Sequence, residues 1–329
     1  MADRIIKVNN VSKSFRTYET GNGFLGGFRK KYSMKNAIEN ISFSVSKGEI
    51  VALIGRNGSG KSTLTKMLSG ILHPDKGNIK MLGKDPWKER IDVAKYIGII
   101  FGSTHPQVFW DLPPEDTFKY IKEIYNVSEK DYNERLESLL NMLDLKKVYK
   151  RQTRQLSLGE RMKCEFVAVM LYMPKIIIMD EATVGVDLPS RIAMGNAILE
   201  MRKKFNLTAV ITTHVVEDIS IADRLVLIDY GKKLYDGPVK KFKDKFANYT
   251  VLELEFEDRK HIAEYMKLGK ALVKNNNYLK LAIKPSAIKN PEFIKIFKDR
   301  NITNYRVSDP MLSSILEDFY KGIDTAKTR

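Results

Sequence analysis

A glycine-rich stretch near the start of the chain has the residue types and spacing of a phosphate-binding loop. Residues 55–63 match the pattern G-x-x-x-x-G-K-[ST]. Glycines let consecutive backbone N–H groups turn toward one anion, the lysine reaches the β- and γ-phosphates of a nucleoside triphosphate, and the serine hydroxyl ligates Mg²⁺. The residues expected to contact the nucleotide here are Gly55, Asn57, Gly58, Ser59, Gly60, Lys61, Ser62 and Thr63.

A pair of acids farther along the chain supplies the chemistry of a second half-site. Residues 176–179 are apolar, and Asp180 and Glu181 follow directly. An apolar run of this kind indicates a buried strand of a parallel sheet, and ligands bind at the carboxyl ends of such strands. We expect Asp180 to hold Mg²⁺, through water, and Glu181 to accept a proton from the water that attacks the γ-phosphate.

The flanking residues indicate the elements that position the loop. Residues 49–54, apolar after Glu49, predict a buried strand, and residues 61–70 predict a helix that ends at Gly70. Phosphate would then lie at a helix N-terminus, where unpaired N–H groups and the helix dipole favour negative charge. Alone, the first motif also fits a chance glycine turn and the second a capped loop. Together they predict a nucleoside triphosphate site.

Further motifs follow in an order that resembles the ATP-binding cassette (ABC) ATPases over about the first 240 residues. Leu-Ser-Leu-Gly-Glu at 156–160 is similar to the family's signature loop. Phe15 is similar to the aromatic that stacks on adenine, Asp187 to the aspartate of the D-loop, and His214 to the switch histidine. The resemblance implies an α/β fold, a P-loop NTPase ABC ATPase core with a helical subdomain, that binds and hydrolyses ATP with Mg²⁺.

The resemblance also implies a mechanism that needs two copies of the chain. Two cassettes close head-to-tail as a homodimer, and each ATP lies between the P-loop of one and the signature loop of the other, where Ser157 and Gly159 face the γ-phosphate. His214 then contacts the γ-phosphate beside Glu181 and holds the attacking water. The residues themselves also allow a helix cap for Ser157, completed by Glu160 in a capping box, and a strand-end histidine for His214.

The glutamine that the family places after the strand at 97–101 has no counterpart at the usual position. Gln107 is expected to act from a displaced position, as a ligand of Mg²⁺ and as a catalytic group, and Ser103 is the alternative. In the same loop, Phe109 and Trp110 lie where the family receives a short helix of its membrane partner. A structural plug of the loop is the other interpretation of these two aromatic residues.

Two stretches resemble a branch of bacterial ATPases tied to ABC-2-type exporters. They are the loop at 101–113 and Gln-Leu-Ser-Leu-Gly-Glu-Arg-Met at 155–162. That branch also carries an extended segment like Thr17–Asn36, which is glycine-rich and basic and predicts a long loop. The resemblance implies export driven through separate integral-membrane permease subunits, at the cytoplasmic face of the cell membrane. The alternative is a non-transport ABC ATPase that acts on ribosomes or nucleic acid.

Composition is compatible with an enzyme subunit outside the bilayer. The longest apolar run, residues 166–173, is far shorter than the 18–20 or so residues that span a membrane, and the opening residues lack the long apolar stretch expected of a signal segment. The single cysteine, Cys164, is expected to pack in the core. The net charge of +16 fits a lysine-rich genome, proximity to an anionic membrane, or nucleic acid. No motif for specific nucleic-acid binding accompanies this charge.

The order of predicted elements divides the chain in two. Residues 1–240 are expected to form the nucleotide-binding domain, with a helical subdomain at about 103–172 that contains helices at 114–125, 129–143 and 158–172. Residues 246–329 predict strand, helix, two strands, helix and strand, followed by one more helix. That order is typical of a small ferredoxin-like α+β domain with an accessory or regulatory role.

Overall fold

The computed structural model describes residues 3–19, 31–102, 106–213, 216–258, 262–289 and 291–327. The chain forms two compact units, Met1–Pro238 and Val239–Arg329. The first unit contains two sheets and the second contains one, and each unit has its own buried core.

A six-stranded sheet is the centre of the first unit. Its spatial order is β5-β6-β7-β3-β8-β9, and all neighbours are parallel except the pair β8 and β9. The strands, in that order, are Ile97–Phe101, Ile176–Asp180, Thr208–Thr212, Ile50–Ile54, Arg224–Asp229 and Lys232–Pro238. The three central strands β6, β7 and β3 are buried along their whole length, as continuous apolar runs in a parallel sheet require. The parallel P-loop sheet confirms the predicted fold class.

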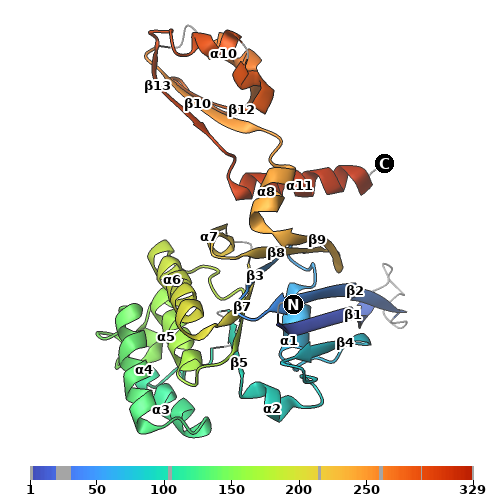
Figure 1. Ribbon diagram of the computed structural model, residues 1–329, viewed down its shortest axis with the longest axis vertical. Helices are drawn as coiled ribbons and strands as arrows, with labels where there is room; N and C mark the ends of the chain where they lie inside the picture. Colours follow the sequence, from blue (N-terminus) through green and yellow to red (C-terminus); the bar gives the residue numbers. More distant parts are fainter. Residues whose placement is uncertain are drawn as a thin grey trace, which may run out of the picture. The chain divides into compact units, whose positions relative to one another are not determined.

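Alternate residues of each central strand belong to separate hydrophobic clusters on the two faces of the sheet. On β6, Ile177 and Met179 pack with helices α5 (Leu158–Met170) and α6 (Leu188–Phe205), whereas Ile176 and Ile178 pack toward α1 (Lys61–Leu68). Figure 1 shows α5 and α6 on one side of the sheet and α1 on the other. The phosphate-binding loop therefore enters α1 from a sheet that is covered on both faces.

A second, antiparallel sheet covers α1 and has the order β2-β1-β4. Its strands are Lys31–Ser46, Arg4–Glu19 and Lys76–Met81. The prediction of a loop over Thr17–Asn36 is wrong at both ends, because β1 and β2 continue as a paired arm in which Thr17 lies opposite Ser33. Thr17 and Ser33 are only partly buried and Tyr32 and Met34 are exposed, so the arm has no buried apolar face that a sequence pattern would reveal. Residues 20–30 lie outside the described part of the chain.

The helical subdomain follows β5 and resembles its prediction closely. Helix α3 spans Pro114–Ile124, α4 spans Glu129–Met142, and α5 begins at Leu158 after a short 3₁₀ turn at Thr153–Gln155. Ser128 caps α4 by accepting the N–H of Asp131 at 3.1 Å. Helices α2 (Arg90–Ala94) and α7 (Val216–Ser220) and strand β9, all in the first unit, were not predicted from the sequence.

Strand β9 is joined to β8 by a two-residue turn. Asp229 lies opposite Lys232, and the two residues between them, Tyr230 and Gly231, have φ of 48° and 76°. Positive φ at both positions is the geometry of the type I′ turn, which favours a tight hairpin. A tyrosine at the first of these positions is uncommon, and the sequence pattern therefore did not indicate the hairpin.

The second unit is a four-stranded antiparallel sheet with order β11-β12-β10-β13. These strands are Gly269–Lys274, Tyr278–Ile283, Thr250–Phe256 and Ile302–Ser308. Helix α9 (Ile262–Tyr265) with a following 3₁₀ turn (Met266–Leu268) lies between β10 and β11, and a 3₁₀ turn (Pro285–Lys289) with α10 (Pro291–Lys295) lies between β12 and β13. The topology is the ferredoxin-like βαββαβ arrangement expected from the sequence. Helices α8 (Val239–Phe246) and α11 (Leu312–Lys327) flank this core in the chain.

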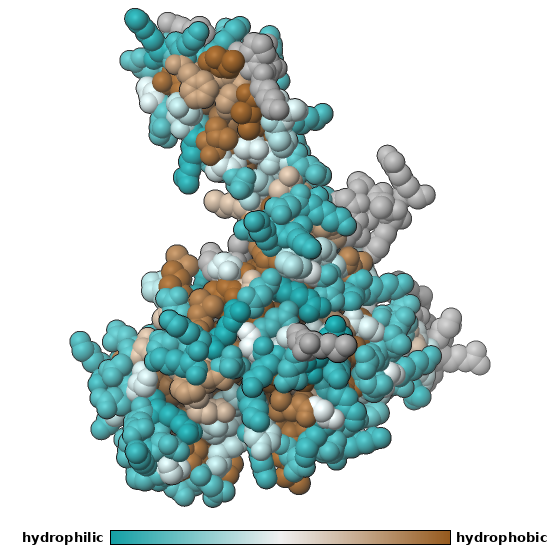
Figure 2. Space-filling view, in the orientation of Figure 1, coloured by the Kyte–Doolittle hydropathy of each residue, from teal (hydrophilic) through white to brown (hydrophobic). Residues whose placement is uncertain are grey.

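The face of the molecule seen in Figure 2 is mostly hydrophilic. Figure 2 shows hydrophobic residues on the visible face gathered in separate patches among hydrophilic ones. Within the described residues, none of the helices combines the length and apolar character that a membrane crossing needs. Cys164 is fully buried in the cluster beneath α5, as core packing requires.

Candidate nucleotide-binding site

The phosphate-binding loop joins the end of β3 to the start of α1 with little room for side chains. Gly60 has φ of 107° and Gly58 has φ of 76°, a backbone conformation that L residues rarely adopt. A side chain on Gly55 would collide with the backbone carbonyl of Ile228 and with Oγ of Ser59. The loop encloses a pocket of about 310 Å³ that is lined by Ala37, Asn57, Gly58, Gly60, Lys61, Ser62, Thr63 and Glu181.

The helix that follows the loop presents free backbone N–H groups to this pocket. Gly60 occupies the N-cap of α1, and a glycine has no side chain with which to cap the first turn. The orphan N–H groups and the positive end of the helix dipole therefore face the space where a phosphate would lie. This arrangement is the one that the sequence motif predicts.

Lys61 lies at the pocket with its ammonium group held by the loop itself. Its Nζ donates to the carbonyl oxygens of Gly55 at 2.9 Å and Arg56 at 3.2 Å, and it lies 3.5 Å from Oε1 of Glu181. The lysine side chain is 3% exposed. A buried ammonium with one carboxylate and two carbonyls as neighbours is well placed to exchange those partners for phosphate oxygens.

Ser62 and Asp180 form an oxygen-donor pair suited to Mg²⁺. Ser62 Oγ donates to Oδ1 of Asp180 at 3.3 Å, and Thr212 Oγ1 donates to the same carboxylate oxygen at 2.6 Å. Hydroxyl and carboxylate oxygens are the ligands that Mg²⁺ prefers, with phosphate oxygens and water completing its shell. Among the described residues, no group of three or more His, Cys, Asp or Glu could hold a metal by itself. The donor set therefore fits Mg²⁺ bound together with a nucleotide.

Glu181 directly follows β6 in a strained backbone conformation. Its φ is 53°, and its N–H group donates to both the carbonyl oxygen of Thr212 at 3.1 Å and Thr212 Oγ1 at 2.9 Å. A left-handed conformation at a residue other than glycine is usually maintained by such surrounding contacts and is frequent at functional sites. Glu181 thereby directs its carboxylate into the pocket, where Lys61 is its ionic neighbour.

A β-bulge in the antiparallel sheet brings an unexpected residue to the pocket. The pairing of β1 with β2 skips Ala37, because Lys13 lies opposite Ile38 and Ser14 opposite Asn36. A side chain on Gly60 would collide with the carbonyl oxygen of this alanine. Bulges occur often beside active sites, where they redirect a strand. Nothing in the local sequence indicated Ala37 as a pocket residue.

Phe15, the predicted adenine platform, lies on β1 near this bulge. Its ring is 40% exposed, and the Lys13 ammonium lies 5.8 Å from the ring centroid. Asp75 holds this end of the strand by accepting Lys13 Nζ at 2.6 Å and the N–H of Ser14 at 2.8 Å, and these two contacts keep the pKa of Asp75 below its ordinary value. Lys13 lies over the ring, and the exposed part of the ring is the surface on which a base could stack. Its adenine contact stays a prediction.

The signature loop leads into α5 through the predicted capping box. Ser157 Oγ accepts the N–H of Glu160 at 3.1 Å, and a carboxylate oxygen of Glu160 accepts the N–H of Ser157 at 2.8 Å. The box confirms the capping role that the residue spacing predicted. Because the Glu160 carboxylate turns back to accept the N–H of Ser157, its negative charge is held at the N-terminus of α5. The signature residues are not among those that line the P-loop pocket.

Gly159 and Asp187 are packed against each other in the same chain. Asp187 caps α6 by accepting the N–H of Ser190 at 2.9 Å, and this hydrogen bond lowers the pKa of the carboxyl. A side chain on Gly159 would collide with the Asp187 carboxylate and the Ser190 hydroxyl. Thus the predicted D-loop aspartate contacts the signature glycine, a proximity for which the sequence offers no signal.

The structure does not bring Gln107 into the P-loop pocket. Its side-chain amide donates to the backbone carbonyl of Ile99, and its own N–H donates to Oε1 of Glu165 at 2.7 Å. Gln107 is absent from the pocket lining, so its assigned roles in catalysis and metal binding stay predictions. His214 and Ser103 both lie outside the described residues. Thr213, the last described residue before His214, donates its hydroxyl to Asp218 at 2.7 Å.

Besides Ala37, the roles of Thr212 and Glu165 were not predicted from the sequence. Thr212 positions both acids of the site, and Glu165 holds the loop that contains Gln107. Thr212 is the last residue of a strand rich in β-branched residues, which is ordinary for a strand. Glu165 is a charged residue between the apolar residues Cys164 and Phe166 of a predicted helix. Only the second is a sequence signal, because a carboxylate on a buried helix face needs a partner.

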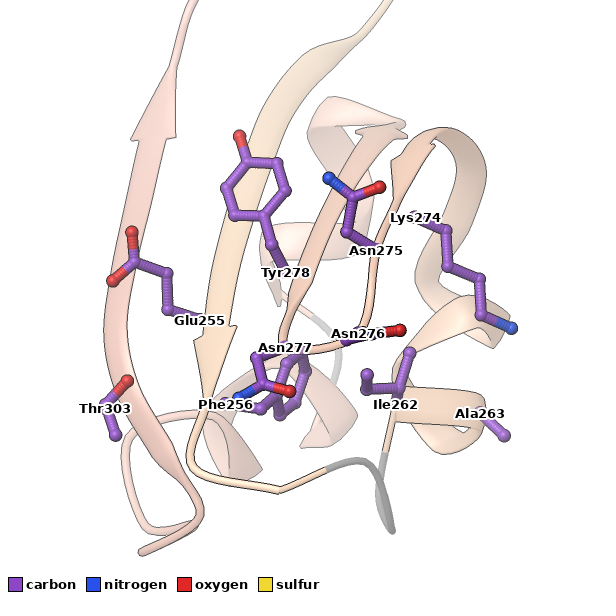
Figure 3. A pocket seen from close by; sticks show the side chains of 10 residues that line it. All are labelled: Glu255, Phe256, Ile262, Ala263, Lys274, Asn275, Asn276, Asn277, Tyr278 and Thr303. Atoms are coloured by element: carbon purple, nitrogen blue, oxygen red, sulfur yellow. The ribbon is translucent and has the colours of Figure 1, made fainter.

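A larger pocket, of about 1090 Å³, lies in the second unit. Figure 3 shows side chains from the β11–β12 turn and the neighbouring strands, with the Lys274 ammonium directed away from the Glu255 carboxylate. The described lining residues do not pair a nucleophile with a base and form no phosphate loop. Nucleotide chemistry is therefore assigned to the P-loop pocket.

Comparisons with known proteins agree with this assignment. Residues 38–184 match the family model described as ABC transporter. The energy-coupling factor transporter ATP-binding protein EcfA1 of Clostridioides difficile (strain 630) is 33% identical over 255 residues, which cover 77% of this chain and 87% of that protein.

Solved structures share the fold of the first unit. The structure of cbiO1 from Clostridium perfringens, described as part of the ABC transporter complex cbiONQ, has a TM-score of 0.60 at 24% identity and covers 74% of this chain and 94% of its own. A dimeric ATP-binding cassette in a post-hydrolysis state, bound to ADP and Pi, has a TM-score of 0.59 at 19% identity, with 71% and 98% coverage.

The name of the Clostridioides difficile relative bears on the predicted transporter branch. It denotes an energy-coupling factor transporter, so the expected ABC-2 exporter branch is not supported. The sequence identity and coverage of this relative support the prediction of an ABC cassette that binds and hydrolyses ATP. The chain belongs to the ABC transporter family, as an ATP-binding subunit.

Proposed function

We propose that two copies of this chain close head-to-tail on ATP and drive transport through separate membrane subunits. One observation in particular supports the proposed dimer. The residues that line the P-loop pocket come from the β2 bulge, the loop itself and Glu181, and none comes from the signature loop at 156–160. The pocket of one copy thus lacks the capped N-terminus of α5, and a second copy can supply it with Ser157 facing the γ-phosphate. A solved relative of this fold is dimeric.

Within the closed dimer the chain's own residues divide the chemistry. Lys61 and the N–H groups of the loop bind the β- and γ-phosphates, and Phe15 stacks on adenine. Glu181 accepts the proton of the attacking water, and His214 holds that water in line. Asp187 lies beside the signature loop and contacts the partner copy across the interface.

Ser62 and Asp180, which are already hydrogen-bonded to each other, would hold Mg²⁺ together with the nucleotide. When bound, the ion neutralises charge on the phosphate oxygens. Gln107 would reach this place only by leaving its contact with Ile99. In this proposal Thr212 keeps the Asp180 carboxylate oriented toward the pocket by its 2.6 Å hydrogen bond.

The membrane subunit is proposed to dock on exposed apolar side chains of the loop after β5 and of helix α3. Trp110 is 48% exposed, which does not fit an interior plug, and its neighbour Phe109 contacts Tyr120 at a centroid distance of 5.4 Å. The exposed members of this docking surface are Phe109, Trp110, Leu112, Tyr120 and Ile124. A short amphipathic helix of a membrane protein is the occupant that such a surface fits. The subunit would then lie peripherally at the cytoplasmic face of the cell membrane.

Two directions of transport follow from different observations. Export was expected from the resemblance of the loop at 101–113 and the signature sequence, whereas the named relative is a subunit of an energy-coupling factor transporter. The membrane partner decides between them, because its own sequence identifies the transporter class. Ribosomes or nucleic acid as the captured partner would contradict transport and leave ATP hydrolysis intact.

The dimer is tested first, by light scattering of Glu181→Gln with and without Mg-ATP. We expect an ATP-dependent dimer, and Ser157→Ala in the same background should bind ATP while staying monomeric. ATP binding by Glu181→Gln without dimerisation would overturn the head-to-tail proposal.

The partner is tested by capture of Glu181→Gln from detergent-solubilised native membranes with Mg-ATP. We expect one integral membrane protein in stoichiometric amount, and we expect its loss when Trp110→Ala removes an exposed aromatic of the docking surface. Equal capture by the Trp110→Ala variant would contradict the docking surface without affecting the dimer.

A further inference from the structure

The loop that contains Trp110 has no regular structure of its own. Residues 106–113 form neither helix nor strand, so their position depends on contacts with other elements. Strand β5 and helix α3 supply some of these contacts, through Ile99 and Thr117, and the others come from the stretch that leads into α5 and from α5 itself. The carbonyl of Leu112 accepts the N–H of Thr153 at 3.1 Å, and the carbonyl of Trp110 accepts the N–H of Arg154 at 3.1 Å.

Helix α5 holds the other end of this loop with two charged side chains one turn apart. Oε1 of Glu165 accepts the N–H groups of Gln107 at 2.7 Å and Val108 at 3.2 Å. The Arg161 guanidinium lies 5.3 Å from the centroid of the Trp110 ring, within cation–π distance. Residues 153–165 therefore contact the loop at Gln107, Val108, Trp110 and Leu112, in addition to its hydrogen bonds with Ile99 and Thr117.

Glu165 is an unusual side chain for this position. It is 1% exposed, and its second carboxylate oxygen, Oε2, has no hydrogen-bond partner among the residues that the structure describes. Burial raises the pKa of this carboxyl to about 7. A buried carboxyl with an unpaired oxygen is a poor source of stability compared with an apolar side chain of the same size. What it contributes is the position of two backbone N–H groups 57 and 58 residues away in the chain.

We propose that Glu165 is a positioning residue that couples the signature helix to the Trp110 loop, so that ATP binding at the N-terminus of α5 moves the docking surface. This inference rests on the proposed function, in which Ser157 contacts the ATP of the second copy. Ser157 and Glu165 are eight residues apart in one helix, a rise of about 12 Å. A continuous helix transmits a displacement over this distance as a rigid body.

Two substitutions of the same size separate the hydrogen bonds from the packing. Glu165→Gln keeps an oxygen that can accept both N–H groups, whereas Glu165→Met fills the space with no comparable acceptor. Cys164→Ala, at the adjacent fully buried position, controls for a change in the packing of α5. The chain has two tryptophans, so Trp87→Phe leaves Trp110 as the only tryptophan reporter.

The experiment measures acrylamide quenching of Trp110 fluorescence in the full chain that carries Trp87→Phe and Glu181→Gln, with and without Mg-ATP. We expect ATP to change the quenching constant in this parent, in Glu165→Gln and in Cys164→Ala. In Glu165→Met we expect that change to be lost, while ATP affinity, measured separately, stays at the parent's value.

An ATP-dependent change that persists in Glu165→Met would overturn the inference, as would an ATP-bound parent whose Trp110 does not respond. Failure of the parent to bind ATP would instead overturn the proposed function. If Glu165→Met does not fold, residue-resolved hydrogen exchange of the parent decides. Protected amides at Gln107 and Val108 support the inference, and exchange at the rate of an unstructured peptide contradicts it.

Discussion

Gly159 and Asp187 are in contact within one chain, and the aspartate carboxylate occupies the space that a side chain on the glycine would need. The signature loop and the loop before α6 are thereby packed as one surface, although 28 residues separate these two positions in the sequence. Asp187 is itself fixed, because it caps α6 through the N–H of Ser190. Any change at Gly159 must therefore displace the D-loop aspartate.

Gly159→Ala should separate ATP binding from ATP turnover. The added methyl group would collide with Asp187 and lie 2.9 Å from Cβ of Ser190, which should cost about 1–3 kcal/mol of folding stability. We expect ATP affinity close to wild type, because the P-loop is untouched, with loss of ATP-dependent dimerisation and of hydrolysis. Steady-state ATPase assays and light scattering measure the two effects.

Gly195→Ala is the matched control for that substitution. Gly195 lies inside α6, and a methyl group there would first meet Ile221 at 3.6 Å, an ordinary contact. Alanine replaces glycine favourably within a helix, by up to about 1 kcal/mol. The control should be as active as wild type and slightly more stable, and equal damage from both variants would contradict the steric explanation of Gly159.

Lys61 and Glu181, 3.5 Å apart, should fail in opposite ways when changed. Lys61→Ala removes the ammonium that binds phosphate, so nucleotide binding should be lost. Glu181→Gln keeps the shape of the pocket and removes the base, so ATP should bind without turnover. Isothermal titration and phosphate release distinguish the two outcomes. Normal ATP affinity in Lys61→Ala, or residual wild-type hydrolysis in Glu181→Gln, would remove the corresponding residue from its role.

Glu160 should contribute to stability through its hydrogen bond to the backbone of Ser157. Glu160→Ala deletes half of the capping box at the start of α5 and should lower the free energy of unfolding by about 0.5–1 kcal/mol. Glu160→Gln can keep the bond and should lie close to wild type. Urea unfolding compares the three proteins, and an unchanged midpoint in Glu160→Ala would show that the box contributes nothing measurable.

Cys164 should be chemically silent in the folded chain. Its side chain is fully buried, and burial raises the pKa of the thiol to about 12, so almost no reactive thiolate exists near neutral pH. A chromogenic disulfide reagent at pH 8 should detect no thiol in the native protein and one per chain in guanidinium. Rapid reaction under native conditions would mean that the cluster beneath α5 opens.

Much of the site followed from the sequence because its geometry is local. The loop at 55–63, the acids at the end of β6 and the Ser157–Glu160 box each lie within a few neighbouring residues. Helical spacing, glycine backbone freedom and strand ends act over that range, so residue types and spacing predict such features directly. The same reasoning failed for Thr17–Asn36, where a local excess of glycine and lysine hid a long β-arm.

Other features were decided only by the tertiary structure. The bulge that places Ala37 at the pocket, the hold of Thr212 on Asp180, the contact of Gly159 with Asp187 and the clamp of Glu165 on the Trp110 loop all join distant parts of the chain. Their positions depend on how strands pair and how helices pack on the sheet. These long-range contacts depend on burial and strand pairing summed over the whole fold, which the sequence constrains only indirectly. The residue types therefore determined the ATP chemistry, and the packing determined how the two halves of the site are held.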